Sequence, residues 1–117
     1  MPVSTFRDLV AWQEAMQLVE DVYAPSATLP REERFGLATQ MKRAVVSIPS
    51  NIAEGARRRR RLTFRYHLEV ALGSQGEVEV QLEIAHRLGF IDEARFREAS
   101  ERAETVGRLL TRLIESI

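Results

Sequence analysis

Apolar residues recur at spacings of three and four along most of the chain, which is the spacing of one face of an α-helix. Between residues 9 and 23 this pattern forms two neighbouring stripes. The first stripe consists of Leu9, Trp12, Met16, Val19 and Tyr23. The second consists of Ala11, Ala15, Leu18 and Val22. Because two stripes leave only a narrow polar face, we expect this helix to contact more than one neighbour.

Proline and glycine delimit the first two predicted helices. Asp8 can cap the first helix, and Pro25 ends or kinks it. The second helix is predicted from residue 31 or 34 to residue 54, with a kink at Pro49 because its apolar spacing continues beyond that proline. We expect Gly55 to be its C-terminal cap, because glycine tolerates the left-handed backbone conformation found there.

Two further helices follow. Thr63 can cap the third helix, whose apolar repeat covers residues 64–85, and Gly89 is predicted to end it. Asp92 can cap a fourth helix, in which the apolar spacing continues to Ile117. No segment alternates with the period of two that a half-buried strand needs. The predicted fold is therefore all-α, an antiparallel up-down-up-down four-helix bundle.

Length and composition narrow the classes of protein. A chain of 117 residues with 44% hydrophobic and 29% charged residues fits one globular domain over residues 1–117. The absence of cysteine excludes disulfides and thiolate chemistry. No signal-peptide pattern is visible, and no run reaches the roughly 18 apolar residues of a membrane span. We therefore expect a cytoplasmic protein without membrane contact.

The residues carry no recognisable catalytic or metal motif. No serine has a nucleophile context and no glycine-rich phosphate loop is present, so we expect no catalytic residue and no enzyme. Glu83 and His86 form a Glu-x-x-His pair, but di-iron bundles need two such pairs and further glutamates. We interpret His86 as a surface residue near the helix end, and expect no metal and no other cofactor.

Five consecutive arginines stand out in a chain whose formal net charge is zero. They are Arg57, Arg58, Arg59, Arg60 and Arg61, and residues 42–65 around them hold eight basic residues and one acid. On a short connector, their guanidinium groups can bind the phosphates of RNA or DNA. The alternative is a solvated linker whose first arginines oppose the negative C-terminal end of the second helix.

A polar stripe follows one edge of the second helix, at spacings of three and four. It consists of Gln40, Arg43, Ser47, Asn51 and Glu54. Arg43 could pair with Glu77 or Glu79 of the third helix and join two helices or two subunits. We interpret these residues as a buried hydrogen-bonded network that fixes the helix register, in preference to a ligand site.

The double stripe of the first helix leaves apolar surface for contact with another subunit. The candidates for such an oligomer contact are Trp12, Ala15, Leu18 and Val22. Aromatic residues are favoured in protein cores and in interfaces, so both positions stay open for Trp12.

The stretch FGLATQMKRAVVSIPSNIAEGARR, residues 35–58, carries the long motif F-G-L-x-x-Q-x-x-R-A-x-x-S-I-x-x-N-I-A-E-G. The opening FRDLVAWQEA looks like F-x-D-L-x-x-W-Q-x-A, and ALGSQGEVEVQLEIAHRLGFI looks like A-x-G-S-x-x-E-x-x-x-Q-L-x-x-A-x-x-L-G-Y/F-I. With these motifs, residues 6–91 resemble the four-helix bundle family encoded within intervening sequences of bacterial 23S ribosomal RNA genes. The family is also called S23 or IVS proteins.

This resemblance implies a four-helix bundle and, by analogy with relatives, a homopentameric ring. Relatives include the accessory variability-determinant protein of diversity-generating retroelements, which works with a reverse transcriptase and nucleic acid. The resemblance implies no established activity. The arginine run is also denser than the mixed basic and polar connector usual in the family, so nucleic-acid contact is not simply inherited from it.

We therefore hypothesise a non-enzymatic homo-oligomer, a pentamer by the resemblance, whose arginine connector binds RNA or DNA backbones without strong sequence preference. The alternative is a protein-interaction scaffold or adaptor with no role in nucleic-acid binding. Steep salt dependence of binding to short nucleic acids favours the first hypothesis. Capture of a protein partner at high salt favours the second.

Overall fold

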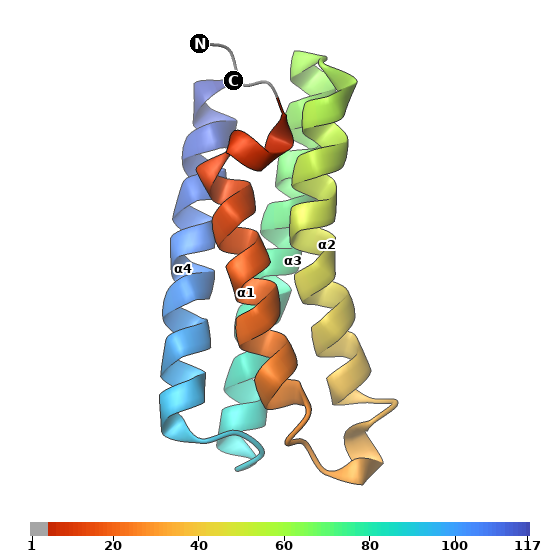
Figure 1. Ribbon diagram of the computed structural model, residues 1–117, viewed down its shortest axis with the longest axis vertical. Coiled ribbons are helices and arrows are strands. Elements are labelled where there is room, and N and C mark those ends of the chain that lie inside the picture. The colour runs from red at the N-terminus through yellow and green to blue at the C-terminus, as the bar shows by residue number, and fades with distance from the viewer. Residues whose placement is uncertain (1–4) are drawn as a thin grey trace.

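A computed structural model describes residues 5–117 as four long helices and two short 3₁₀ helices (Figure 1). In chain order they are η1 (Phe6–Asp8), α1 (Val10–Ser26), η2 (Arg31–Glu33), α2 (Leu37–Arg58), α3 (Arg61–Arg87) and α4 (Glu93–Ser116). Successive long helices run in opposite directions in Figure 1, within a molecule that measures 45 × 24 × 20 Å. The prediction of an all-α four-helix bundle is confirmed.

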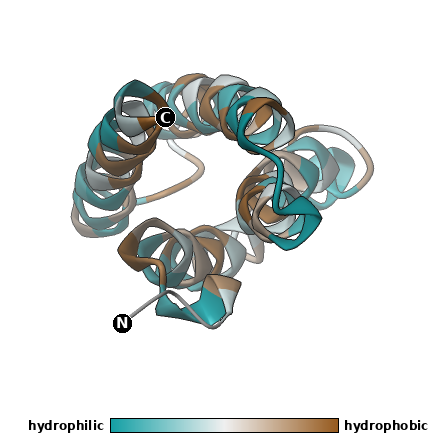
Figure 2. Ribbon diagram, turned by 90° about the horizontal axis from the view of Figure 1, so that it is seen from above, coloured by the Kyte–Doolittle hydropathy of each residue, from teal (hydrophilic) through white to brown (hydrophobic). Residues whose placement is uncertain are grey.

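Apolar side chains face the inside of the bundle, as the hydropathy colours in Figure 2 show. Each long helix packs against its two neighbours, and α2 and α3 share the most extensive contact. Large side chains from all four helices are fully buried at the centre, among them Leu18, Ile48, Leu68, Leu82 and Leu110. Each such side chain contributes about 1.5–3 kcal/mol to folding when it leaves water.

The two apolar stripes of α1 have different roles. The stripe of Ala11, Ala15, Leu18 and Val22 faces the core, whereas Met16 and Tyr23 of the other stripe are exposed. Because Ala15, Leu18 and Val22 have no accessible surface within the bundle, the prediction that they contact another subunit is wrong. Trp12 is half-buried and packs edge-on against Phe6, with the ring centroids 5.2 Å apart.

Two of the predicted N-terminal caps are wrong. Asp8 belongs to η1, where its carboxylate accepts a hydrogen bond from the Thr5 amide, and Leu9 precedes α1 without a side-chain cap. Thr63 lies inside α3, which begins at Arg61 because the chain turns through only two residues after α2. Short connections between antiparallel helices leave little room for a separate capping segment.

The two predicted boundaries between α3 and α4 are confirmed. Gly89 has φ +74°, and its amide donates to the His86 carbonyl while the Phe90 amide donates to the Ala85 carbonyl. This pattern is a Schellman motif, which requires a left-handed residue at that position. Asp92 caps α4 by accepting from the Arg95 amide at 2.8 Å.

Gly55 is not the end of the second helix, and that prediction is wrong. The helix passes Pro49 and Gly55 and continues to Arg58, and Arg59 forms the left-handed cap with φ 56°. A Cβ atom at Gly55 would lie 2.7 Å from the His67 Cβ and 3.1 Å from the Phe64 ring. Gly55 is therefore needed for close packing of α2 against α3 rather than for a turn.

Gly73 and Gly76 are different from Gly55. Both lie inside α3, and a Cβ atom at either would meet nothing within 4 Å. Glycine in a helix interior costs about 0.8–1.0 kcal/mol relative to alanine. Nothing within the bundle explains why these two residues are glycine.

We predict opposite effects for alanine at Gly55 and at Gly76. Gly55→Ala is expected to lower the free energy of unfolding by about 1–3 kcal/mol, because the added methyl group overpacks the contact with His67. Gly76→Ala is the matched control and is expected to raise it by about 0.5–1 kcal/mol. Urea unfolding followed by circular dichroism measures both. Equal stability of the two variants would contradict the close contact between α2 and α3.

Candidate nucleic-acid interface

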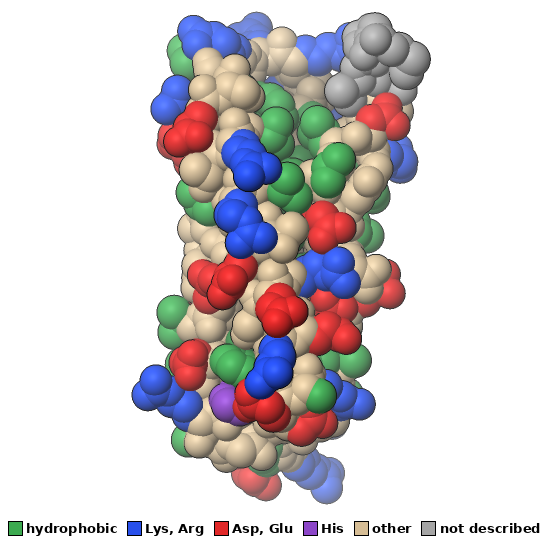
Figure 3. Space-filling model, turned by 90° about the vertical axis from the view of Figure 1, so that its left-hand side faces the viewer, with side chains coloured by type: hydrophobic (Ala, Val, Ile, Leu, Met, Phe, Trp, Pro, Cys, Tyr) green, Lys and Arg blue, Asp and Glu red, His purple; other side chains and the backbone are tan. Residues whose placement is uncertain are grey.

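The five arginines form a tight turn between two helices and not an extended connector. Arg57 and Arg58 are in the last turn of α2, Arg59 is its left-handed cap, Arg60 precedes α3, and Arg61 begins α3. All five side chains are exposed. Basic groups gather at the upper end of the bundle in Figure 3, which is the end where Figure 1 places this turn.

Two of the five arginines are held by other groups. The Arg58 guanidinium donates to Glu54 Oε1 from Nε at 2.9 Å and from Nη2 at 2.6 Å. This hydrogen bond, together with the positive charge of Arg58, lowers the pKa of Glu54 below its ordinary value. Arg61 Nη1 donates to the carbonyl of Ile117 at 3.0 Å, which ties the start of α3 to the end of α4.

The other three arginines are available to a ligand. Arg57, Arg59 and Arg60 form no ion pair or side-chain hydrogen bond within residues 5–117. Arg57 and Arg59 line a cavity of about 680 Å³ together with Arg7 of η1 and the ring of Phe64. The cavity therefore joins guanidinium groups from two parts of the chain.

The polar stripe of α2 is only partly a network. Asn51 Nδ2 donates to the Ser47 carbonyl and to Ser47 Oγ at 2.9 and 3.1 Å, and Ser74 Oγ of α3 donates to Ser47 Oγ at 2.9 Å. Asn51 Oδ1 lies 3.0 Å from His67 Nδ1 and accepts a hydrogen bond from this ring nitrogen. Ser47 and Asn51 thus join α2 to α3, as the hydrogen-bonded interpretation predicts.

The remaining members of that stripe do not take part in it. Gln40 and Arg43 are exposed, and Glu54 is bound to Arg58. Glu77 is exposed as well, and no ion pair joins Arg43 to Glu77 or Glu79 in the part of the chain that the structure describes. The predicted ion pair is therefore not formed, and all three side chains are exposed to solvent.

Sequence reasoning missed the role of His67 in the network. His67 lies seven residues before Ser74, and this spacing places both side chains on the same face of α3. The heptad spacing of two polar residues was the signal that could have identified it.

Sequence reasoning also missed a cluster of charged groups between α1 and α4. Arg102 Nε donates to Asp21 Oδ2 at 2.9 Å, and Arg102 Nη1 donates to Glu14 Oε1 at 3.1 Å. The hydrogen bond that Arg102 donates to Asp21, followed by the one that it donates to Glu14, raises the pKa of Arg102 above its ordinary value. The Asp21 side chain is only 6% exposed, so Arg102 takes the place of water as a hydrogen-bond donor to its carboxylate.

Glu83 and His86, the two residues of the Glu-x-x-His motif, contact different partners. His86 Nε2 lies 2.7 Å from Glu93 Oε2, and the His86 ring stacks on Phe96 with the centroids 4.0 Å apart. Glu83 is bound to Arg87 instead. Within residues 5–117, no group of three or more His, Asp or Glu side chains is placed to hold a metal ion. In the same part of the chain, no helix combines the length and apolar character of a membrane span.

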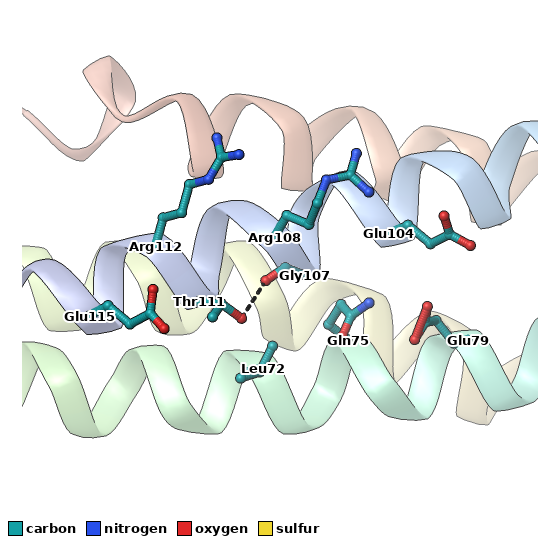
Figure 4. A pocket seen from close by; sticks show the side chains of 9 residues that line it. All are labelled: Leu72, Gln75, Glu79, Glu104, Gly107, Arg108, Thr111, Arg112 and Glu115. Carbon is teal, nitrogen blue, oxygen red and sulfur yellow. Dashed lines mark hydrogen bonds between the residues drawn. The ribbon is translucent and has the colours of Figure 1, made fainter.

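A second cavity, of about 540 Å³, lies between α3 and α4 (Figure 4). Its floor contains Gln75, which is buried and donates to the Ala103 carbonyl at 2.8 Å. Gly107 makes room for this amide, since a Cβ there would lie 2.9 Å from Gln75 Nε2. The rim carries acidic and basic side chains, among them Glu79, Glu104 and Arg108. The hydrogen bond to Ala103 and the space at Gly107 explain why the apolar repeat of α3 contains glutamine at position 75.

These features define a small helical bundle with structural polar contacts and one exposed cluster of arginines. Residues 7–112 match the family described as 23S rRNA-intervening sequence protein, and the chain belongs to this family. A comparison with curated protein sequences finds no match.

Among solved structures, the chain is similar to a protein of unknown function from the S23 ribosomal protein family of Bacteroides thetaiotaomicron. The two are 23% identical, and the alignment covers 91% of this chain and 96% of the other, with a TM-score of 0.82. This likeness confirms the fold.

We predict that Arg102 contributes more to stability than an exposed arginine of α4. Arg102→Leu removes the positive charge beside the nearly buried Asp21 carboxylate, so the free energy of unfolding is expected to fall by about 1–3 kcal/mol. Arg97→Leu is the control, because Arg97 forms an exposed pair with Glu93 worth about 0.3–0.5 kcal/mol. Urea titrations of both variants test this, and equal losses would refute a structural role for the cluster.

Proposed function

We propose that this protein is a non-enzymatic homo-oligomer that binds RNA or DNA backbones through the turn formed by residues 57–61. The observation that carries the proposal is that Arg57, Arg59 and Arg60 are exposed and that none of them forms an ion pair or a hydrogen bond with an acidic side chain within residues 5–117. Guanidinium groups stay charged at all physiological pH values and bind phosphate in a forked geometry. An exposed cluster of this kind attracts polyanions without selecting a sequence.

The local backbone supports the proposal, because stability alone does not favour arginine at several of these positions. Arg57 and Arg58 are favourable beside the negative C-terminal end of α2. Arg60 and Arg61 lie instead at the positive N-terminal end of α3, where a cation is unfavourable. Arg59 adopts a left-handed conformation that costs a non-glycine residue roughly 1–2 kcal/mol. A bound phosphate would offset the repulsion among these groups.

No enzymatic role is proposed. The buried and half-buried polar groups, such as Asn51, His67 and Gln75, are engaged in hydrogen bonds between helices. A general acid or base must lie within hydrogen-bonding distance of its substrate. The hydrogen bonds of these groups are instead made to other helices of the bundle. The homopentameric assembly stays a prediction from the family resemblance.

Nucleic-acid binding is tested by fluorescence anisotropy with a structured RNA and a DNA duplex over a series of salt concentrations. The variant Arg57→Ser/Arg59→Ser/Arg60→Ser is expected to lower the slope of log affinity against log salt by about 2 to 3, because each lost phosphate contact removes about 0.9 from it. The control is Arg31→Ser/Arg34→Ser/Arg95→Ser, which removes three exposed arginines at the other end of the bundle.

The two triple variants carry the same net charge, so they separate a local site from a general effect of charge. Equal losses in both would show that the turn is no specific binding element. Weak, salt-insensitive binding by the unmodified protein would refute the proposal and favour the protein-adaptor alternative.

A single substitution at Glu54 is expected to strengthen binding. Glu54→Gln removes the carboxylate that holds Arg58 and so frees a fourth guanidinium group. We expect affinity for the duplex to rise about two- to fivefold, in line with the 0.2–1 kcal/mol of an exposed ion pair. Glu83→Gln is the control, because it frees Arg87 far from the turn. An unchanged affinity for Glu54→Gln would argue against a role for Arg58.

A further inference from the structure

The cavity of about 680 Å³ beside the turn formed by residues 57–61 has only basic residues among its charged lining residues. They are Arg7, Arg57 and Arg59, and no acidic residue is among the described residues that line it. We name this space the turn cavity. The cavity between α3 and α4 differs, because it is lined by glutamates as well as arginines. The turn cavity therefore favours a ligand with negative charge.

The rest of the turn cavity is largely apolar. Apart from Thr5, its remaining lining residues are apolar and half-buried: Phe6, Leu9, Ala56 and Phe64. A phosphate group alone would contact the arginines and leave this apolar surface in contact with water. An unpaired nucleotide matches both parts of the lining, because its base is a flat aromatic ring and its phosphates are negatively charged. Stacking of unpaired bases on aromatic side chains beside basic groups is a common way in which proteins bind single strands.

The short helix η1 is held beside the turn cavity by contacts that need no ligand. The Arg7 amide donates to Thr5 Oγ1 at 2.9 Å, and Gln13 Nε2 donates to the Arg7 carbonyl at 2.9 Å. The Phe6 ring packs edge-on against Trp12, and the Arg7 guanidinium lies 4.6 Å from the centroid of the Phe6 ring. Within residues 5–117, Arg7 forms no ion pair, so its charge is available to a phosphate. A site that is formed before its ligand arrives loses less conformational entropy on binding.

We propose that the turn cavity binds an unpaired nucleotide of single-stranded RNA or DNA, with the base against the apolar lining and the flanking phosphates on the three arginines. This inference rests on the proposed function and makes it more specific, since contact with a backbone alone does not require unpaired bases. The bases of a duplex are paired and stacked, so they enter such a cavity only after a costly unpairing. All lining residues belong to one copy of the chain, so the proposal does not depend on the number of copies in the assembly.

Fluorescence anisotropy with two single strands separates the contribution of the bases from that of the backbone. The first probe is an oligothymidylate of about twelve nucleotides, and the second is a strand of equal length whose units lack bases. Both strands carry the same number of phosphates, so contact with the backbone alone gives them equal affinity. We expect the oligothymidylate to bind about tenfold more tightly, which is within the range for stacking of one base on an aromatic side chain. Equal affinities would overturn the proposal.

A substitution that fills the turn cavity gives the second test. Ala56→Leu adds apolar volume at a half-buried lining residue and leaves every arginine in place. We expect it to lower the affinity for oligothymidylate about tenfold and to leave the affinities for the strand without bases and for a DNA duplex unchanged. Ala94→Leu, at an exposed site of α4 at the opposite end of the bundle, is the control and is expected to change none of the three. An unchanged affinity of Ala56→Leu for oligothymidylate, or an equal loss with all three ligands, would overturn the proposal.

The salt dependence of binding tests whether η1 belongs to the site. Arg7→Ser is expected to lower the slope of log affinity against log salt for oligothymidylate by about 0.7, the contribution of one phosphate contact in a single strand. Arg31→Ser is the matched control, because Arg31 is an exposed residue of the other 3₁₀ helix, at the opposite end of the bundle. Equal slopes for the two variants would refute a site that includes η1.

Failure of this proposal is distinguishable from failure of the proposed function. If the two single strands bind alike while Arg57→Ser/Arg59→Ser/Arg60→Ser loses salt-sensitive binding to the duplex, the turn binds backbones and the turn cavity binds no base. If the unmodified protein shows no salt-sensitive binding to any of the three nucleic acids, both proposals are overturned.

Discussion

Gly55 allows α2 to lie so close to α3 that no side chain fits between them at that point. A Cβ atom at this position would lie only 2.7 Å from the Cβ atom of His67. The same approach brings Asn51 within 3.0 Å of His67 and Ser47 within 2.9 Å of Ser74. These hydrogen bonds form only while the two backbones stay close, and partly buried hydrogen bonds in turn fix the helix register. Close packing and hydrogen bonding thus stabilise the same contact between α2 and α3.

The geometry of the turn formed by residues 57–61 depends on this contact between α2 and α3. Because α2 continues past Gly55 for another turn, Arg57 and Arg58 have helical geometry, and only Arg59 and Arg60 remain to reverse the chain. A helix that ended at Gly55 would have left the whole basic run in an extended segment. The charges are therefore concentrated at one end of the bundle by the packing of residues that are not themselves charged.

The fold was largely predictable because its signals are local. The spacing of apolar residues identified all four helices, and the Gly89 and Asp92 caps depend only on neighbouring backbone groups. Gly55 was misread because glycine suits both a helix end and a close helix contact, and only its neighbour on α3 decides between them. Which of the two apolar stripes of α1 faces the core was ambiguous for a similar reason. The small side chains of Ala11 and Ala15 allow closer packing of α1 than the larger side chains of the other stripe do.

The candidate site was less predictable than the fold. The arginines were visible in the sequence, but which of them are engaged depends on Glu54 and on Ile117, and the second of these is distant in the chain. The contact of Arg102 with Asp21 likewise joins residues 81 positions apart. Apolar periodicity carries no information about such pairs, because the polar faces of two helices are matched only after the bundle forms.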